Sequence, residues 1–274
     1  MEKQGRENNL TIHSLITLIL SGITSIIALF FAIPVIGRLL HWLWNIVLTA
    51  VWGVVGLFGV LLEAILSVFG VQLKKKLRIC VVILRDEDGK PVIEPGEIIE
   101  PISKAVNTFK AAANVRIVRS GLPLNGLESS QKDQVDESWV QINLGSGRKA
   151  DLEPGCNLRG TIDDLLLVGS SYQLATISRC FYGTWRRVTG YAAPIVVFIV
   201  RDVIGFKGCS LGPLTDYVVI EAGDPKCIAH ELGHACNLWH SKKDDNLMKS
   251  NCCGTLLNWW QKILLRISRH VTYF

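Results

Sequence analysis

The stretch HELGHACNLWH, residues 230–240, contains three of the six histidines in the 274-residue chain. Residues four apart on an α-helix face the same side, so His230 and His234 can hold one metal ion with their ring nitrogens. Glu231 follows the first histidine, and its carboxylate can reach water at an open coordination position without binding the metal itself. The stretch therefore predicts two metal ligands and one general base.

A third ligand requires the helix to end inside this stretch. His240 is six residues beyond His234, and on a continuous helix it would point about 240° away from it. Asn237 lies between them, and asparagine is, after glycine, the residue that most readily adopts the left-handed conformation that ends helices. We therefore expect a turn at Asn237 that brings His240 back to a tetrahedral zinc site with one position open for water.

Histidines on helices are commonly surface or core residues, and an isolated H-E-x-x-H pattern also arises by chance. Here the third histidine, the turn-permitting Asn237 and the following NLM at 246–248 agree with one another. The run resembles the zinc helix and Met-turn of the metzincin metallopeptidases, in which glycine is more frequent at the position of Asn237. The resemblance implies that the three histidines bind Zn²⁺. It also implies that Glu231 deprotonates the zinc-bound water for attack on a peptide carbonyl, and that Met248 forms a hydrophobic floor beneath the histidines.

Two other classes of zinc peptidase do not fit these residues. The gluzincins take their third ligand from a glutamate downstream of H-E-x-x-H, and no glutamate follows Glu231, which excludes that class. Site-2-type proteases place the motif inside a membrane span. Here GDPK at 223–226 and SKKDD at 241–245 flank it, and such charge density is costly in hydrocarbon. The zinc helix is therefore predicted to belong to a soluble domain.

The beginning of the chain has the composition of a membrane region. The chain is 49% hydrophobic, and the excess is concentrated in residues 1–73. Residues 10–36 include no Asp, Glu, Lys or Arg and exceed the roughly 20 residues that span a bilayer. A second apolar run continues to Leu73, interrupted only by Glu63. We predict spans over about 10–36 and 42–63 that form a transmembrane helical hairpin, and the first is too long for a simple signal peptide.

Basic residues predict the orientation of this hairpin. Lys3 and Arg6 precede it, KKKLR at 74–78 follows it, and Arg38 alone lies in the connection. The positive-inside rule then places both termini, and with them the catalytic domain, in the cytoplasm. This prediction requires two crossings, because a second run that merely lies on the membrane would put the domain outside.

The cysteines leave the compartment open. All eight follow the membrane region, an even number that suits either four disulfides in an oxidising compartment or free thiols. A bridge from Cys236 to Cys252 or Cys253 would tie the zinc helix to the segment after the Met-turn. Cys156 invites comparison with the zinc-blocking cysteine of some latent metzincins, but it lies within the catalytic region and not in a removable pro-segment.

Residues 74–274 read as one domain of about 200 residues, in which strands alternate with helices. The expected strands are 76–84, 115–121, 138–145, 193–205 and 216–223, and the expected helices are 97–115, the zinc helix and 256–270. The fold class is α/β (α+β): a metzincin-like catalytic domain with a mixed twisted sheet and an active-site helix, preceded by the hairpin. The resemblance implies an edge strand beside the cleft, which IEAG (220–223) or LGPLTDY (211–217) would line; a plain core strand and loop is the alternative.

The sequence therefore predicts a membrane-anchored zinc endopeptidase that acts on protein or peptide substrates. Its partners are the substrate and the lipid bilayer. We expect no nucleic-acid partner, because the chain has no phosphate-binding glycine loop and no surface of alternating aromatic and basic residues. Two alternatives stay open: a membrane-tethered zinc-binding protein without turnover, and a zinc hydrolase of non-peptide amides. The oligomeric state is not predicted.

Overall fold

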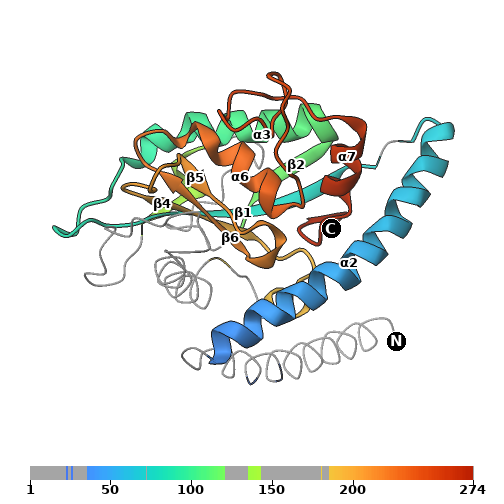
Figure 1. Cartoon of the computed structure of the whole chain (residues 1–274), viewed down its shortest axis with the longest axis horizontal. Helices are drawn as coiled ribbons and strands as arrows, with labels where there is room; N and C mark the ends of the chain where they lie inside the picture. Colours follow the sequence, from blue (N-terminus) through green and yellow to red (C-terminus); the bar gives the residue numbers. More distant parts are fainter. Residues whose placement is uncertain are drawn as a thin grey trace, which may run out of the picture.

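The computed structural model describes residues 23, 26, 36–71, 73–120, 135–142, 180 and 185–273 (Figure 1). The predicted span over 10–36 lies outside these residues, apart from positions 23, 26 and 36, and so does Cys156. The helix α2 (Ile36–Val68) covers the second apolar run and extends beyond the predicted 42–63 at both ends. Within the described residues it is the one helix whose length and composition suffice to cross a membrane, over Leu43–Val68.

A mixed sheet forms the centre of the domain. Its order is β2-β1-β4-β6-β5, and β3 and β7 also pair with β1. The strands β5 and β7 are antiparallel to their neighbours, and the other pairs are parallel. The bounds are β1 (Lys75–Ile83), β2 (Val115–Arg119), β3 (Val140–Ile142), β4 (Ile195–Val200), β5 (Gly208–Cys209), β6 (Tyr217–Glu221) and β7 (Val271–Thr272).

Helices and short 3-10 turns connect these strands. Within the described part of the domain the longest helix is α3 (Ile99–Ala113), which ends at Asn114 in the left-handed conformation, with φ of 52°. The other helices are α5 (Trp185–Thr189), α6 (Ile228–Ala235) and α7 (Trp259–Arg266). The 3-10 turns are η1 (Pro95–Ile98), η2 (Glu137–Trp139), η4 (Gly212–Leu214) and η5 (Pro225–Cys227). The mixed α/β architecture predicted from the sequence is confirmed.

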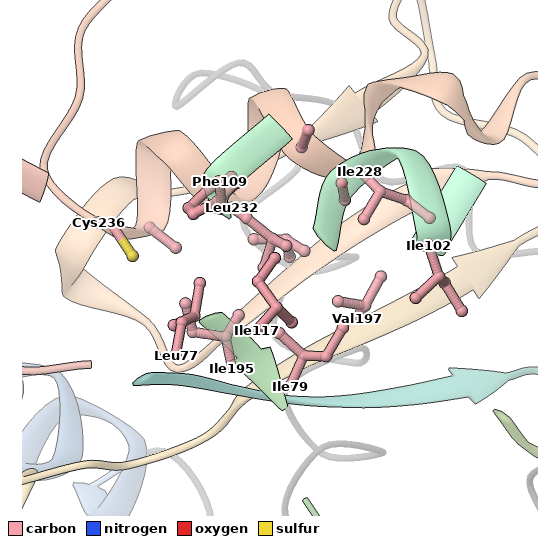
Figure 2. Close-up of a cluster of buried hydrophobic side chains, with 14 of the residues drawn as sticks. Leu77, Ile79, Ile102, Phe109, Ile117, Ile195, Val197, Ile228, Leu232 and Cys236 are labelled. Atoms are coloured by element: carbon pink, nitrogen blue, oxygen red, sulfur yellow. The ribbon is translucent and has the colours of Figure 1, made fainter. Parts of the chain in front are cut away.

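The central strand β1 is buried on both faces and divides the core in two. Alternate side chains of a strand point to opposite faces, so Leu77 and Ile79 join one apolar cluster, and Cys80 and Val82 join another. The first and larger cluster lies between the sheet and the helices α3 and α6, which contribute residues such as Phe109 and Leu232 (Figure 2). Packing of α6 on this core fixes the position of the histidine-bearing helix.

Two interpretations of IEAG and LGPLTDY were open: segments that line the cleft beside an edge strand, or a plain core strand and loop. The structure favours the second, because β6 is an internal strand that pairs with both β4 and β5. The strand at this end of the path is β5, and a strand of two residues is too short for any hydrophobic alternation to reveal it. The C-terminal helix is also shorter than the predicted 256–270, because Asn258 caps it one residue before Trp259.

Candidate metal centre

The histidine-bearing helix α6 is short because its two ends are set by specific residues. Pro225 begins the preceding turn η5, and proline at the start of a helical segment loses no backbone hydrogen bond. At the other end Asn237 has φ of 73°, and the Leu238 amide donates to Gly233 O at 3.0 Å. The chain thus leaves the helix axis directly after the second histidine.

This reversal brings three imidazoles together. His234 Nε2 lies 3.1 Å from His230 Nε2 and 3.2 Å from His240 Nε2. One ligand atom from each of the three side chains lies within 4.8 Å of the others. Three nitrogens that converge on one point, without an acidic group among them, form a site of the kind that holds a metal ion in proteins.

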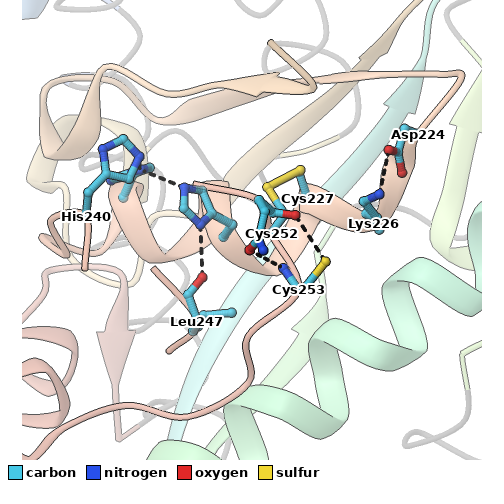
Figure 3. The surroundings of a disulfide bond; sticks show 10 residues. Asp224, Lys226, Cys227, His240, Leu247, Cys252 and Cys253 are labelled. Carbon is cyan, nitrogen blue, oxygen red and sulfur yellow. Dashed lines mark hydrogen bonds and ion pairs between the residues drawn. A yellow bond between two sulfur atoms is a disulfide. The ribbon is translucent and has the colours of Figure 1, made fainter. Parts of the chain in front are cut away.

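In His230 and His234 the other ring nitrogen is held by a backbone carbonyl. His230 Nδ1 donates to Leu247 O at 2.9 Å, and His234 Nδ1 donates to Leu238 O at 2.8 Å. Figure 3 shows Leu247 beneath its histidine, with His240 beside that ring. Because Nδ1 carries the proton in each ring, the Nε2 lone pairs face the shared centre. Orientation of this type is typical of imidazoles that bind a metal.

The spacing and the charge state of the rings fit zinc. Zinc–nitrogen bonds of about 2.0–2.1 Å in tetrahedral geometry separate two ligand nitrogens by about 3.3 Å, close to the distances found here. Burial lowers the pKa of His230, and it lowers the pKa of His234 to about 4. Both rings are therefore neutral at pH 7, the form in which an imidazole donates its lone pair to a metal.

Glu231 lies on the same helix, next to the first histidine, and its side chain is buried. Burial raises the pKa of its carboxyl to about 8. Gly208 of β5 lies directly against this side chain, since a Cβ atom there would be 2.7 Å from Glu231 Cγ. The sequence analysis missed Gly208, because nothing local marks a glycine as the neighbour of a side chain 23 residues away.

The segment after the third histidine folds back under the helix. Met248 is fully buried, and its carbonyl accepts from the Ser241 amide at 2.8 Å. The turn is held by Asn246, whose Oδ1 accepts from the Met248 amide at 2.9 Å. Asn246 also exchanges two side-chain hydrogen bonds with Gln261 of α7, at 2.8 and 3.1 Å. The turn beneath the histidines is thus fixed to the C-terminal helix.

Gln261 is a further residue that the sequence analysis missed, although a signal was present. Asn258 and Gln261 form a capping box at the start of α7: each side chain bonds the backbone amide of the other. An asparagine followed three residues later by glutamine is a readable helix start. Its second role, the pairing with Asn246, is a tertiary contact that no local pattern predicts.

The expected cysteine bridge is wrong in one partner. Cys252 bonds Cys227, which directly precedes α6, and not Cys236 (Figure 3). Cys236 is a buried free thiol whose pKa burial raises to about 12, and Cys253 is an exposed free thiol. The bridge still connects the segment of the histidine-bearing helix to the chain after Met248, but it does so at the beginning of the helix.

Comparisons with known proteins give likenesses to solved structures. No protein-family model matches the chain, and no curated protein matches it. The fold is similar to the crystal structure of metalloproteinase-II from Bacteroides fragilis, at a TM-score of 0.39 and 11% sequence identity. The likeness covers 70% of this chain and 52% of that one, so the chain spans about half of that protein's length. The functional argument therefore rests on the site itself.

Proposed function

We propose that the chain is a membrane-anchored zinc endopeptidase of metzincin type, with residues 1–73 as its membrane region and 74–274 as its catalytic domain. The observation that carries the proposal is the convergence of three imidazole Nε2 atoms beside a buried glutamate. A purely structural zinc site would close its fourth position with a protein ligand and would have no use for Glu231. His230, His234 and His240 would hold the metal.

The protein side of the chemistry follows from these positions. Zinc, when bound, supplies Lewis acidity toward water and toward the scissile carbonyl. A bound cation would favour the ionised form of Glu231, against the rise in pKa that burial alone causes. In that form Glu231 accepts the proton of the attacking water at a carboxylate oxygen and then gives it to the departing amine nitrogen. Met248 and the Cys227–Cys252 disulfide hold the histidine-bearing helix and the turn beneath it in one arrangement. The Nε2 atoms therefore need not move when a metal binds. A protein or peptide chain is the substrate that this metzincin-type constellation fits.

The test measures metal content and cleavage together on the full chain in detergent. We expect about one zinc per chain, and cleavage of casein or of a peptide library. Glu231→Gln should retain zinc and lower kcat/KM by about a hundredfold to ten-thousandfold, the usual contribution of a general base. His240→Ala should lose zinc and cleavage together. Lys242→Ala, an exposed change close to His240, is the matched control and should leave both intact.

The outcomes separate the proposal from its alternatives. If zinc remains bound in His240→Ala, the third ligand is misassigned and the metzincin type is wrong. If the parent chain binds zinc and cleaves no peptide, the protein is either a zinc-binding protein without turnover or a hydrolase of non-peptide amides. A panel of small amide substrates then distinguishes these two, because only the hydrolase releases an amine and loses this activity in Glu231→Gln.

A further inference from the structure

The apolar helix α2 contacts the catalytic domain along one side, which includes Trp44, whose Nε1 donates to Val188 O at 2.6 Å, and the buried Leu48. A stripe of six residues runs the length of this side. The stripe consists of the residues Asn45, Thr49, Trp52, Gly56, Gly59 and Glu63, whose spacing alternates between four and three. A spacing that averages 3.6 residues, the repeat of an α-helix, keeps a single line of the helix turned toward a partner. Most residues of the helix outside this stripe are large and apolar.

The first half of the stripe is held by hydrogen bonds. Asn45 Nδ2 and Thr49 Oγ1 donate to two carbonyls of η4, at 3.2 and 3.1 Å. Trp52 Nε1 donates to Thr189 O at 2.6 Å, and its ring lies 4.6 Å from that of Tyr191. Backbone carbonyls of the domain thus accept hydrogen bonds from side chains of the helix. A helix surrounded by lipid does not make such hydrogen bonds.

The second half depends on close approach and charge. A Cβ atom on Gly56 would lie 2.7 Å from Ile267 O, so glycine permits the contact. Glu63, the single charged residue between Leu43 and Val71, accepts from Arg266 Nε at 2.7 Å and lies 3.3 Å from Lys75 Nζ. The one carboxylate of the helix is therefore neutralised by the domain.

The opposite side of α2 is apolar and exposed. Val51, Val54, Phe58, Leu61, Leu62 and Ile65 are each between 50% and 68% exposed. This face includes no charged side chain, and the exposed Lys74 follows the helix. An apolar face of this extent, bounded by a basic residue, fits the hydrocarbon of a bilayer with its anionic headgroups alongside.

The two sides of the helix together restrict its orientation. The stripe from Asn45 to Glu63 runs for about 27 Å, close to the whole hydrocarbon thickness of about 30 Å. If α2 crossed the bilayer over this length, the facing part of the domain would lie in hydrocarbon, with Arg266 and Lys75 included. Charges and irregular backbone are costly there. Figure 1 shows α2 running past the part of the domain that includes α7.

We propose that α2 does not cross the membrane. It lies in the membrane plane with its apolar face in the lipid and its stripe on the domain. The chain then crosses once, through 10–36. Lys3 and Arg6 precede that segment and Arg38 alone follows it before Lys74, so the positive-inside rule puts the catalytic domain outside the cytoplasm.

The cysteines independently support this placement. The described part of the chain includes the disulfides Cys80–Cys180 and Cys227–Cys252, and Cys209 is disulfide-bonded as well. Disulfides persist in oxidising compartments and are rare in the cytosol. A domain with several of them suits the extracytoplasmic side, which a single crossing reaches and a hairpin of two crossings does not.

The first test reads the side of the membrane directly. The full chain is synthesised into sealed microsomes with a glycosylation acceptor in the exposed turn after β1, made by Asp88→Asn with Lys90→Thr. Thr11→Ala removes the native acceptor that begins at Asn9. A single crossing predicts a glycan that endoglycosidase removes, whereas Asp88→Asn without the second change gains none. An unmodified acceptor would mean two crossings and would overturn the proposal.

The second test asks whether α2 is seated on the domain. Gly56→Leu and Gly53→Leu add the same side chain one turn apart, but a Cβ atom at Gly53 meets nothing within 4 Å. In micelles we expect Gly56→Leu to lower the thermal midpoint of the full chain by several degrees, and Gly53→Leu to leave it unchanged. Equal midpoints for the two variants would contradict the seated helix.

The third test identifies what covers the apolar face. A photoreactive phenylalanine analogue replaces Phe58, and the full chain is reconstituted in vesicles of phosphatidylcholine and phosphatidylglycerol. Illumination is expected to give lipid adducts. Cross-links to residues 10–36 or to a second copy of the chain would show that protein covers this face, and the in-plane arrangement would be wrong.

Discussion

A Cβ atom on Gly233 would lie 2.6 Å from Met248 Sδ, so the histidine-bearing helix approaches the turn beneath it as closely as a glycine allows. Glycine within a helix costs about 0.5–1 kcal/mol relative to alanine. Here the absence of a side chain at residue 233 permits the close contact with Met248. We expect Gly233→Ala to lower the free energy of unfolding by about 1–3 kcal/mol, the usual penalty for overpacking a buried contact.

A double-mutant cycle tests this contact by combining Gly233→Ala with Met248→Ala, which removes the obstructing side chain. In that background Gly233→Ala should raise the free energy of unfolding, because the gain in helix propensity is no longer opposed by a clash. Chemical unfolding of the parent, the two single variants and the double variant gives the coupling free energy between residues 233 and 248. If Gly233→Ala has the same effect in both backgrounds, the two residues are not in contact.

A second prediction concerns Gly208 and Glu231. Gly208→Val in β5 should displace the carboxylate, and a shift of about 1 Å can cost roughly a hundredfold in kcat/KM. The three atoms nearest to a Cβ atom at position 208 all belong to Glu231, so the histidines should keep their positions and bound zinc should be retained. Phe206→Val, an exposed change in the preceding loop, is the control. Loss of zinc in Gly208→Val would indicate general damage to the fold and not a displaced base.

The disulfide between Cys227 and Cys252 gives a third prediction. It closes a loop of 25 residues, for which the chain-entropy treatment gives a stabilisation of about 3.5 kcal/mol. Cys252→Ser should therefore lower the thermal midpoint of the zinc-free chain clearly. Cys253→Ser removes only the neighbouring exposed thiol and should not. Equal midpoints in the two variants would mean that this bridge does not stabilise the folded chain.

The parts of the site that the sequence predicted are those set by local geometry. Two histidines four apart share a helix face whatever surrounds them, and a turn at Asn237 follows from the preference of one residue type. The partners of Cys252 and Asn246 depend instead on how distant segments meet. Cys227 and Gln261 are separated from these residues by 25 and 15 positions, and no periodicity relates them.

The same distinction between local and tertiary information explains why α2 was predicted to cross the membrane. Hydropathy averages over a window, so the apolar majority of the run predicted a membrane span. Asn45, Thr49, Gly56 and Gly59 recur at a helical spacing that was visible in the letters, but their meaning depends on a domain that begins 15 residues after the last of them. A polar stripe within an apolar helix has different consequences in lipid and against protein, and only the folded arrangement distinguishes the two.

The last prediction concerns acid stability and the buried His270. Its Nδ1 donates to Ala193 O at 2.8 Å, and its Nε2 lies 3.7 Å from Asp216, which pairs with Arg269. Burial lowers the pKa of His270 to about 4, and the charge of Arg269 acts in the same direction. The folded chain therefore keeps this ring neutral at pH values where the unfolded chain, with a histidine pKa of about 6.5, protonates it.

The direction of the effect follows from linkage. The unfolded state binds the extra proton, so the contribution of His270 to stability is complete above pH 6.5 and decreases as the pH falls toward 4. At pH 5 the free energy of unfolding should be about 2 kcal/mol lower than at pH 8 from this residue. His270→Asn keeps an amide that can donate to Ala193 O and cannot titrate. Measured on zinc-free protein, the difference between parent and His270→Asn should narrow or reverse between pH 8 and pH 5. A difference that does not change with pH would mean that His270 carries the same charge in the folded and unfolded chains.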